Sequence, residues 1–485
     1  MSARRMAALT AVLIGSALFA LVFTKARVAS FTHDESYSFL HYPHQSFMAI
    51  ISFSDWFPNN HILNSLGMKY AEKLFGNSEL ALRSPNLLLL LVFMAYGFLL
   101  FREAQPLLAV ALFTLLGTNP LLMDLFGLAR GYGLSCGFLL MSLYHLITWL
   151  EGGKRRDLLV FHTAALLASL SNFTLLLYYA AALMSCIAIV FVRARISGAK
   201  QYGLYRSNRM HLLPLLVALA VLYEPVRLLI THSHLASGRS TGSDADTVKD
   251  LVTNALHSAA LAPGITLLMQ LLVTAIMVAA MMLIVRMVLR RQVELFEAHM
   301  GLVVSTGVAA LLPVVIITQH LGLGSDYPVA RFSAFLFPIY LVQAGFLCQY
   351  LVAQGYRLVV PAAVSVLALV AAISFTRKID LYASAEWIYD SRTKDMVRVL
   401  SADRAAAHSQ NAGIRLGINW LFEPTTNYYR ETLGLDWLLP VDREGNRGNE
   451  DYFYLFAHDQ GQLDTIPCVV LADYPDAGTI LLKRR

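Results

Sequence analysis

The first residues of this chain whose types suggest chemistry are two adjacent carboxylates, Asp34 and Glu35, which follow an apolar run at 7–24. Two carboxylates at a membrane surface are costly to desolvate unless they meet a cation or a proton. The pair is therefore a candidate for proton or cation chemistry. The structural alternative is that Asp34 caps a helix beginning near Tyr37, because aspartate is a preferred N-cap residue.

The surroundings of this pair are strongly apolar. Of the 485 residues, 57% are hydrophobic and 14% are charged, whereas a soluble protein has roughly 25% charged residues. Residues 1–375 contain 25 basic and 16 acidic side chains, and residues 376–485 contain 13 and 16. We therefore predict a membrane domain over 1–375 and a soluble domain over 376–485. The net charge of +6 does not indicate nucleic-acid binding, because so few charges cannot form a basic stripe.

Candidate membrane spans fill the first domain, since a span needs about 20 mostly apolar residues. The weakest signal is that of 157–171, which is short. The predicted fold class is thus an all-α polytopic membrane domain of about 11 transmembrane helices, followed by a small α/β domain. The eleven segments are 7–24, 79–101, 105–122, 131–150, 157–171, 174–193, 211–231, 264–289, 300–319, 332–351 and 358–375.

The orientation of these spans follows from the basic residues in the short loops. With the N-terminus in the cytoplasm, the inner segments collect 15 basic and five acidic residues, whereas the outer segments of the membrane domain hold 10 and 11. An odd number of spans then places the tail outside. The prediction is a multi-pass protein of the cytoplasmic (inner) membrane with an extracytoplasmic C-terminal domain.

Three outer segments are long enough to do chemistry, namely 25–60, 232–263 and 320–331. The stretch 35–53 mixes aromatic and polar residues, which suggests helices lying on the membrane surface. The inner loops are short and basic and indicate topology only. Function is therefore expected on the outer side.

The tail is predicted to be a small α/β domain. Helical patterns at 389–407 and 424–433 alternate with strand-like runs at 414–418, 452–456, 468–471 and 479–482. None of these elements carries a Gly-rich phosphate loop or a nucleophile elbow. A lid, specificity or partner domain and a purely structural domain both remain open.

Several short motifs follow the acidic pair in a fixed order: Asn60-His61, then Phe75-Gly76 with Ser78-Glu79 to Arg83 and Pro85, then Ala129-Arg130-Gly131-Tyr132, and finally 327–338. In their order and positions they resemble the C-type integral-membrane glycosyltransferases, in the protein mannosyltransferase and lipid A aminoarabinose transferase branch. The chain departs from that pattern where His61 lacks neighbouring prolines and where Gly131 stands inside the Arg-x-Tyr segment.

The resemblance implies a reaction, namely inverting transfer of one sugar from a polyprenyl-phosphate lipid to an envelope acceptor that is a protein, a lipid or a glycan. The acceptor hydroxyl must lose a proton as it attacks, so a carboxylate is needed as general base. Asp34 matches the catalytic aspartate of the family. Glu35 is expected to orient the acceptor or to tune Asp34, with a solvent-facing role as the alternative.

The leaving lipid phosphate needs cationic partners, and arginine supplies bidentate, charge-assisted hydrogen bonds. Arg130, Arg331 and Arg83 all fall at predicted outer ends of spans and are expected to bind it, with His61 as a further donor. The structural alternative is that these arginines reach the membrane surface or pair with neighbours, as Arg83 could with Glu79.

Weaker candidates for an acceptor or accessory role are Asp55, Asp124 and Tyr132. Asp124 falls where related oligosaccharyltransferases place acidic metal ligands, but one aspartate is not a ligand set, because a divalent ion takes several oxygen ligands. The four cysteines share no metal-like spacing. The resemblance to the mannosyltransferase branch implies a reaction without metal, so we expect no metal and no other cofactor, with the sugar lipid as substrate.

Two other classes of protein compete with a transferase. A flippase or secondary transporter for a lipid-linked sugar would also need many spans and membrane arginines, but transporters tend to show internal repeats and charges near the midplane. A third class is a non-catalytic scaffold for an envelope complex, and the presence of the acidic pair argues against it. The expected partners are thus a polyprenyl-phosphate-sugar lipid, the bilayer and an envelope acceptor, without nucleic acid.

Overall fold

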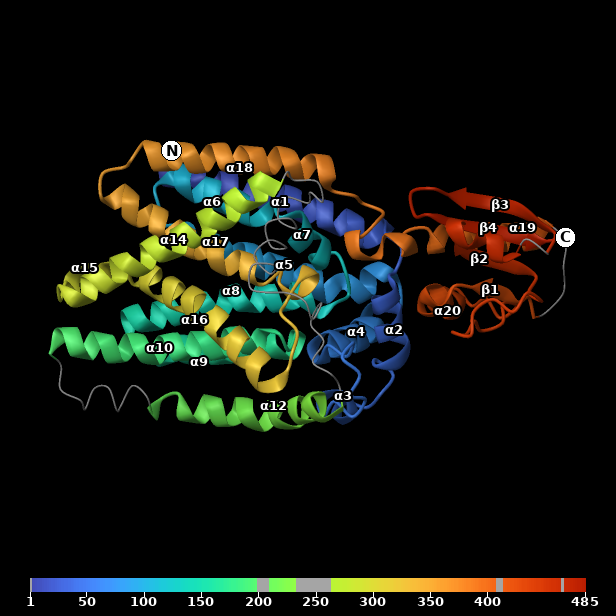
Figure 1. The fold of residues 1–485 in the computed structure, drawn as a ribbon, viewed down its shortest axis with the longest axis horizontal. Helices are drawn as coiled ribbons and strands as arrows, with labels where there is room; N and C mark the ends of the chain where they lie inside the picture. Colours follow the sequence, from blue (N-terminus) through green and yellow to red (C-terminus); the bar gives the residue numbers. More distant parts are fainter. Residues whose placement is uncertain (1, 199–208, 233–262, 407–412, 464–465) are drawn as a thin grey trace.

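The computed structural model describes residues 2–198, 209–232, 263–406, 413–463 and 466–485. Most helices run side by side along the long axis, and a small sheet domain lies beyond one end of this bundle (Figure 1). The predicted outer segment 232–263 lies outside the described residues except for its two ends. The bundle helices are α1 (Ala3–Val28), α5 (Glu79–Phe101), α6 (Pro106–Gly117), α7 (Pro120–Phe126), α8 (Gly131–Gly152), α9 (Arg155–Ser171), α10 (Leu175–Ser197), α12 (Leu212–His232), α14 (Pro263–Leu289), α15 (Val293–Ala298), α16 (Met300–Leu323), α17 (Leu336–Ala353) and α18 (Val359–Lys378).

Nine helices in the described part of the chain are long and apolar enough to cross a membrane, or ten if one bent pair counts as a span. The bent pair is α6 and α7, which meet at 63° within the predicted span 105–122. The break follows from Asn119, whose side chain caps α7, and from Pro120 in its first turn. The predicted span 157–171 is α9, whose 17 residues are at the lower limit for crossing. The chain is a multi-pass membrane protein.

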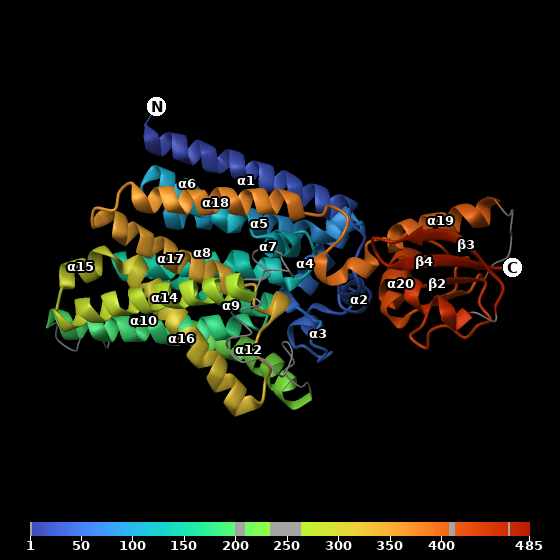
Figure 2. The same ribbon diagram turned by 45° about the horizontal axis from the view of Figure 1, so that its top comes forward.

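Three short helices, α2 (His33–His41), α3 (Phe47–Ile51) and α4 (Ile62–Phe75), lie between the bundle and the sheet domain (Figure 2). We call this end of the bundle the site end. Helix α2 begins with a capping box in which the Thr32 hydroxyl accepts from the Glu35 N–H and the Glu35 carboxylate accepts from the Thr32 N–H. Thr32, not Asp34, therefore caps this helix, and the Asp34 side chain is left for other contacts.

The tail folds into a four-stranded sheet with two helices, as predicted. Strand order is β1-β2-β4-β3, with β1 and β2 parallel and the other pairs antiparallel. Short 3₁₀ turns connect its parts. The elements are η2 (Ala385–Asp390), α19 (Thr393–Ala406), β1 (Leu416–Ile418), η3 (Trp420–Phe422), α20 (Glu423–Thr432), β2 (Tyr452–Phe456), η4 (Ala457–Leu463), β3 (Cys468–Tyr474) and β4 (Thr479–Arg484).

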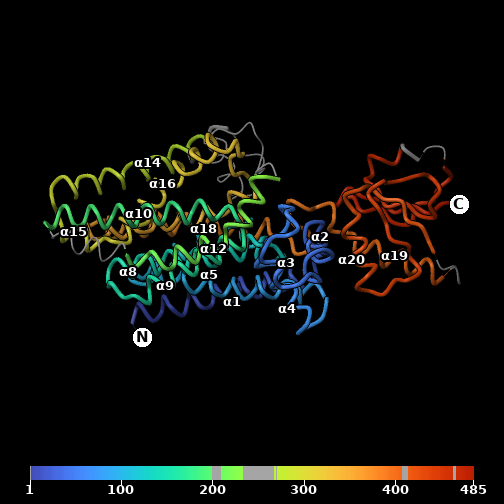
Figure 3. Tube along the Cα trace, turned by 90° about the horizontal axis from the view of Figure 1, so that it is seen from below, coloured from blue at the N-terminus to red at the C-terminus, as the bar shows by residue number. Residues whose placement is uncertain are grey.

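The sheet domain shares a hydrophobic core with the site end of the bundle. Figure 3 shows α20 facing α2. The ring of Tyr428 stacks on Phe31 at 4.2 Å, and the Phe31 N–H donates to the Tyr429 hydroxyl at 2.8 Å. Lys394 adds an ion pair of 2.6 Å to Glu79 at the start of α5. The buried aromatic contacts and this partly exposed ion pair fix the position of the domain over the acidic pair.

Candidate active site

Asp34 stands in the first turn of α2 with its carboxylate between two arginines. Its Oδ2 lies 3.5 Å from Nη2 of Arg130 and 3.4 Å from Nη2 of Arg331. Both separations exceed the usual hydrogen-bond length, and 17% of the side chain is exposed. The carboxylate is thus neutralised from two sides and still accessible. We call Asp34, Arg130 and Arg331 the mouth of the site.

Arg130 is the buried member of the mouth and precedes α8. Its Nη1 donates to the Ser38 hydroxyl at 2.9 Å and to the carbonyl oxygens of Asp34 and Asn59, each at 3.3 Å. Nη2 contacts Nε2 of His61 at 3.1 Å. The buried Nε–H finds no partner among the described residues. Arg130 therefore ties α2 and the loop before α4 together and presents a cation to Asp34.

His61 acts through Arg130. Its Nδ1 lies 2.8 Å from the Ser171 carbonyl, which only accepts, so Nδ1 carries the proton and Nε2 accepts from Arg130. Burial and the charge of Arg130 hold the pKa of His61 well below 6.5. We expected His61 to donate to phosphate, but both ring nitrogens are occupied. A Cβ on Gly131 would lie 1.7 Å from the Ser171 oxygen and 2.7 Å from the His61 ring, so this contact needs the glycine.

Glu35 and Arg83 form a closed pair beneath the mouth, and we call them the floor. Nε and Nη2 of Arg83 donate to the two Glu35 oxygens at 2.8 and 2.7 Å. The Glu35 carboxylate also accepts the backbone N–H groups of Ala129, at 2.6 Å, and Thr32, at 3.0 Å. Both side chains of the pair are completely buried.

Arg83 has no donor left for a phosphate. Its remaining N–H groups donate to the carbonyl oxygens of Ala26, Ala29 and Ser30 at 2.9–3.1 Å. All five N–H donors of the guanidinium are therefore used within the protein. This differs from the expectation that Arg83 binds phosphate and that Glu35 meets the acceptor. The pair instead joins the end of α1, the start of α2 and α5.

Arg331 is the more accessible cation of the mouth, with 25% of its side chain exposed. It lies in a 3₁₀ turn, η1 (Ala330–Phe332), after Ala330, whose φ is 51°. Its Nε donates to the Tyr132 hydroxyl at 3.1 Å, and its Nη1 and backbone N–H both donate to Glu386. Tyr132, expected as an accessory residue, is thus brought into the site as an acceptor for Arg331.

Asp124 lies in a buried junction, away from the mouth. One oxygen is 2.5 Å from Lys25 Nζ, and the other accepts from the Ser384 hydroxyl at 2.6 Å and the Ala385 N–H at 3.2 Å. Both oxygens are used in fastening α7 to the connection that leads to the sheet domain. Asp55 stands half-buried in the loop after α3, where its charge adds to burial in raising the pKa of Tyr37.

The segment between α18 and α19 supplies several residues to the site that were not predicted from the sequence. Besides Glu386 it contributes Trp387, whose ring centroid lies 4.8 Å from the Arg331 guanidinium. It also contributes Asp390, which is fully buried and accepts the His33 N–H at 2.6 Å. Burial raises the pKa of Asp390 well above 3.8. No motif marks these residues, and more than 350 positions separate Glu386 from Asp34 in sequence.

No family model matches the sequence. No curated protein matches it in sequence either. The structure is similar to crystal structures of ArnT from Cupriavidus metallidurans, in the apo state and bound to undecaprenyl phosphate, with TM-scores of 0.54 and 0.53. The sequences are 12% identical, and the alignment covers 97% of this chain and 97% of ArnT. This chain has the fold of the C-type membrane glycosyltransferases.

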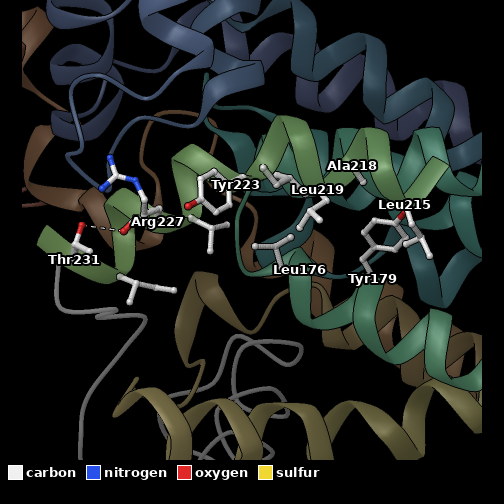
Figure 4. Close-up of a pocket in the computed structure, with 11 residues that line it drawn as sticks. Leu176, Tyr179, Leu215, Ala218, Leu219, Tyr223, Arg227 and Thr231 are labelled. Carbon is white, nitrogen blue, oxygen red and sulfur yellow. Dashed lines mark hydrogen bonds between the residues drawn. The ribbon is translucent and has the colours of Figure 1, made fainter. Parts of the chain in front are cut away.

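Within this C-type glycosyltransferase fold an apolar groove of about 560 Å³ runs between α10 and α12 (Figure 4). One end reaches Arg227 and Thr231, near the end of α12 at which Leu229 packs with Ile50 and Phe53 of the site end. The groove thus extends from within the bundle toward α3. Its lining residues are Leu176, Tyr179, Leu215, Ala218, Leu219, Leu222, Tyr223, Val226, Arg227, Ile230 and Thr231.

Among the residues that the structure describes, no group of three or more His, Cys, Asp or Glu side chains is placed to hold a metal ion. Asp124, the position compared above with metal ligands, is engaged by Lys25. The expectation that the protein works without metal stays a prediction.

Proposed function

We propose that the protein is an inverting glycosyltransferase that moves a single sugar from a polyprenyl-phosphate donor to a hydroxyl group of an envelope acceptor. The observation that carries the proposal is the mouth, in which an accessible carboxylate lies within 3.5 Å of two guanidinium groups. A base beside phosphate-binding cations is what this displacement requires. The likeness in fold to a protein crystallised with undecaprenyl phosphate supports the choice of donor.

Asp34 serves as the general base in this reaction. It accepts the proton of the acceptor hydroxyl as that oxygen forms a bond to the anomeric carbon. The bond from this carbon to the phosphate oxygen breaks on the opposite face, and the configuration is inverted. The lipid phosphate leaves with one more negative charge, which Arg331 and Arg130 stabilise. Because Nη2 of both arginines faces Asp34 before the donor arrives, a phosphate bound there competes with Asp34 for these N–H groups and frees the base.

The groove between α10 and α12 offers a place for the isoprenoid chain of the donor. Its walls are apolar along most of their length, and its end at Thr231 lies near α3 and the start of α4 at the site end. A chain of isoprene units buries its apolar surface there without exposing polar groups. The donor headgroup is then delivered to Arg331 from the side of the membrane.

We further propose that the site end faces outward from the cytoplasmic membrane, with the N-terminus in the cytoplasm. The excess of basic residues in the loops at the other end supports this orientation. The envelope acceptor then reaches the mouth from outside, beneath the sheet domain. A transporter is less well supported, because α2, which carries Asp34 and Glu35, lies at one end of the bundle instead of near its middle (Figure 1).

The decisive experiment compares envelope glycans from a strain that lacks the protein, complemented with wild type or with Asp34→Asn. Mass spectrometry of lipids, glycans and glycoproteins identifies a sugar that wild type restores and that Asp34→Asn does not. Asp395→Asn, which removes an exposed carboxylate of the sheet domain, is the matched control and restores the sugar. Full restoration by Asp34→Asn would show that Asp34 is not the general base. If the deletion strain and the strain complemented with wild type have the same glycans, the protein is not a transferase of envelope sugars.

A further inference from the structure

The cation that faces the donor phosphate is held by a residue from outside the membrane domain. Glu386 of η2 accepts the backbone N–H of Arg331 at 2.9 Å with one carboxylate oxygen and Nη1 of the guanidinium with the other. One side chain thus fixes both the turn around Ala330 and the direction of the guanidinium. The backbone hydrogen bond holds the carboxylate against the turn, so the charge-assisted hydrogen bond to Nη1 gives the guanidinium a defined direction.

Two aromatic residues complete the cradle for Arg331. The Trp387 ring lies against the guanidinium at 4.8 Å, and the Tyr132 hydroxyl accepts from Nε at 3.1 Å. With Nε and Nη1 engaged, Nη2 points toward Asp34 and keeps donor capacity for a ligand. A free arginine side chain loses rotamer entropy when it binds a ligand, so this ordering in advance prepares the cation for binding.

The η2 segment is itself anchored on both sides of Glu386. Before it, Ser384 and Ala385 donate to the buried Asp124, which pairs with Lys25. After it, Asp390 accepts the N–H of His33, the residue next to Asp34. The segment is therefore fixed to α7 and to α2, and Glu386 has a defined position relative to the mouth.

We propose that Glu386 is the positioning residue that orients Arg331 toward the donor phosphate, so that the segment leading to the sheet domain forms part of the donor site. The inference rests on the proposed function, because it takes Arg331 as a phosphate ligand. It assigns a role in catalysis to a part of the chain for which the sequence left lid, partner and structural roles open. Binding of an anionic lipid should therefore depend on Glu386 although its own charge is negative.

The test measures binding of undecaprenyl phosphate to the full-length protein in nanodiscs. Dissociation constants are determined for wild type, Glu386→Gln, Arg331→Gln and the double variant, together with their melting temperatures. Each single substitution is expected to weaken binding by about tenfold or more, the effect of losing a charge-assisted hydrogen bond. The double variant is expected to bind no more weakly than Arg331→Gln, because Glu386 acts through Arg331.

A matched control exists in the cytoplasmic half of the proposed topology. Glu297 accepts two hydrogen bonds from Arg193, and the exposure of that pair is similar to that of Arg331 and Glu386. Glu297→Gln is expected to leave the dissociation constant unchanged. If Glu386→Gln does not fold, Glu386→Asp replaces it, since a side chain shorter by one methylene cannot reach both N–H groups and should also weaken binding.

Three results would overturn the role of Glu386 alone: unchanged binding in Glu386→Gln, tighter binding, as expected of a carboxylate that competes with phosphate, or losses that multiply in the double variant. A wild-type protein that does not bind undecaprenyl phosphate, or an Arg331→Gln variant that binds it normally, would instead overturn the proposed donor site and this inference with it.

Discussion

Asp34 and Glu35 are neighbours in α2, but their surroundings differ completely. Glu35 is fully buried and bound to Arg83, Ala129 and Thr32, whereas Asp34 is partly exposed and has two arginines at 3.4–3.5 Å. Successive residues of a helix point about 100° apart, so the start of α2 at His33 decides which carboxylate faces the bundle. One turn of helix thus builds both the floor that holds the site together and the mouth that can react.

Asp34 is available for chemistry because its neighbour Glu35 uses the buried hydrogen-bond donors at the start of α2. Arg83 and the N–H groups at the floor satisfy Glu35, and Thr32 supplies the helix cap. Among the described residues, the Asp34 carboxylate therefore neither caps the helix nor makes a short hydrogen bond, and only the backbone carbonyl of this residue accepts hydrogen bonds, from Asn59 and Arg130. The two arginines of the mouth then neutralise its charge without enclosing it. Substitutions in the mouth should change activity, and substitutions in the floor should change stability.

The largest effect is expected for Asp34→Asn. Loss of a general base lowers turnover by about 10²- to 10⁴-fold, while the amide keeps the shape of the side chain. The melting temperature should stay within a few degrees of that of wild type, because no short hydrogen bond to the carboxylate is lost. Turnover is measured in vesicles with the donor identified from the glycan analysis. A variant with normal stability and near-normal turnover would contradict the assignment of the mouth.

Glu35→Gln should have its main effect on stability. It leaves the Arg83 charge buried without its counter-ion, and breaking such a pair costs about 3–5 kcal/mol. The change is read from denaturant unfolding in micelles and from the yield of membrane-inserted protein. Protein that does fold should retain more turnover than Asp34→Asn. A Glu35→Gln variant of normal stability that lacks turnover would show that Glu35 takes part in the reaction instead of only stabilising the fold.

Replacing an arginine by lysine in the mouth and in the floor separates effects on donor binding from effects on stability. Arg130→Lys keeps a charge but loses the fork that contacts Ser38 and His61, and we expect donor affinity to fall about tenfold. Arg83→Lys loses most of the hydrogen bonds of the floor and should lower stability first. Donor binding and unfolding are measured for both variants. Equal effects on both quantities would show that mouth and floor are one structural unit.

The fold and the mouth could be predicted from sequence to different extents. Long apolar runs determine the spans, and periodicity located the strands of the tail, but the break at Asn119 depends on a cap and a proline inside one apolar run. The motifs predicted that Asp34, Arg130 and Arg331 belong to one site, and the structure places both guanidinium groups within 3.5 Å of the Asp34 carboxylate. Arg83 belongs to the same motif, and only its carbonyl contacts reveal that its donors are used. Glu386 meets Arg331 through tertiary packing that no local pattern records.

A smaller effect on the free energy of unfolding is expected from a change of pH, because Arg130 of the mouth donates to the neutral His61 ring. The folded state holds the pKa of His61 well below 6.5, so below that pH the unfolded chain binds a proton that the folded protein does not. The contribution to the free energy of unfolding is fully present above pH 6.5 and falls below it by at most about 1.4 kcal/mol per pH unit.

Denaturant unfolding of wild type and His61→Gln at pH 7.5, 6.5 and 5.5 isolates this contribution. Asp390, whose raised pKa gives the opposite dependence on pH, is common to both proteins and cancels in the difference. The stability advantage of wild type should shrink as the pH falls. An advantage that is constant over this range would mean that His61 binds its proton equally in both states.

The smallest effect is expected from removal of divalent metal. In transfer of a sugar from a phosphate, a metal ion serves to neutralise the leaving group. Arg331 and Arg130 supply two positive charges at the mouth, and Asp124, which the sequence offered as a possible metal ligand, is paired with Lys25. Turnover after dialysis against EDTA should therefore stay within about twofold of the untreated value. Loss of turnover that Mg²⁺ or Mn²⁺ restores would show that the two arginines do not suffice, and that the mouth takes part of its charge from an ion.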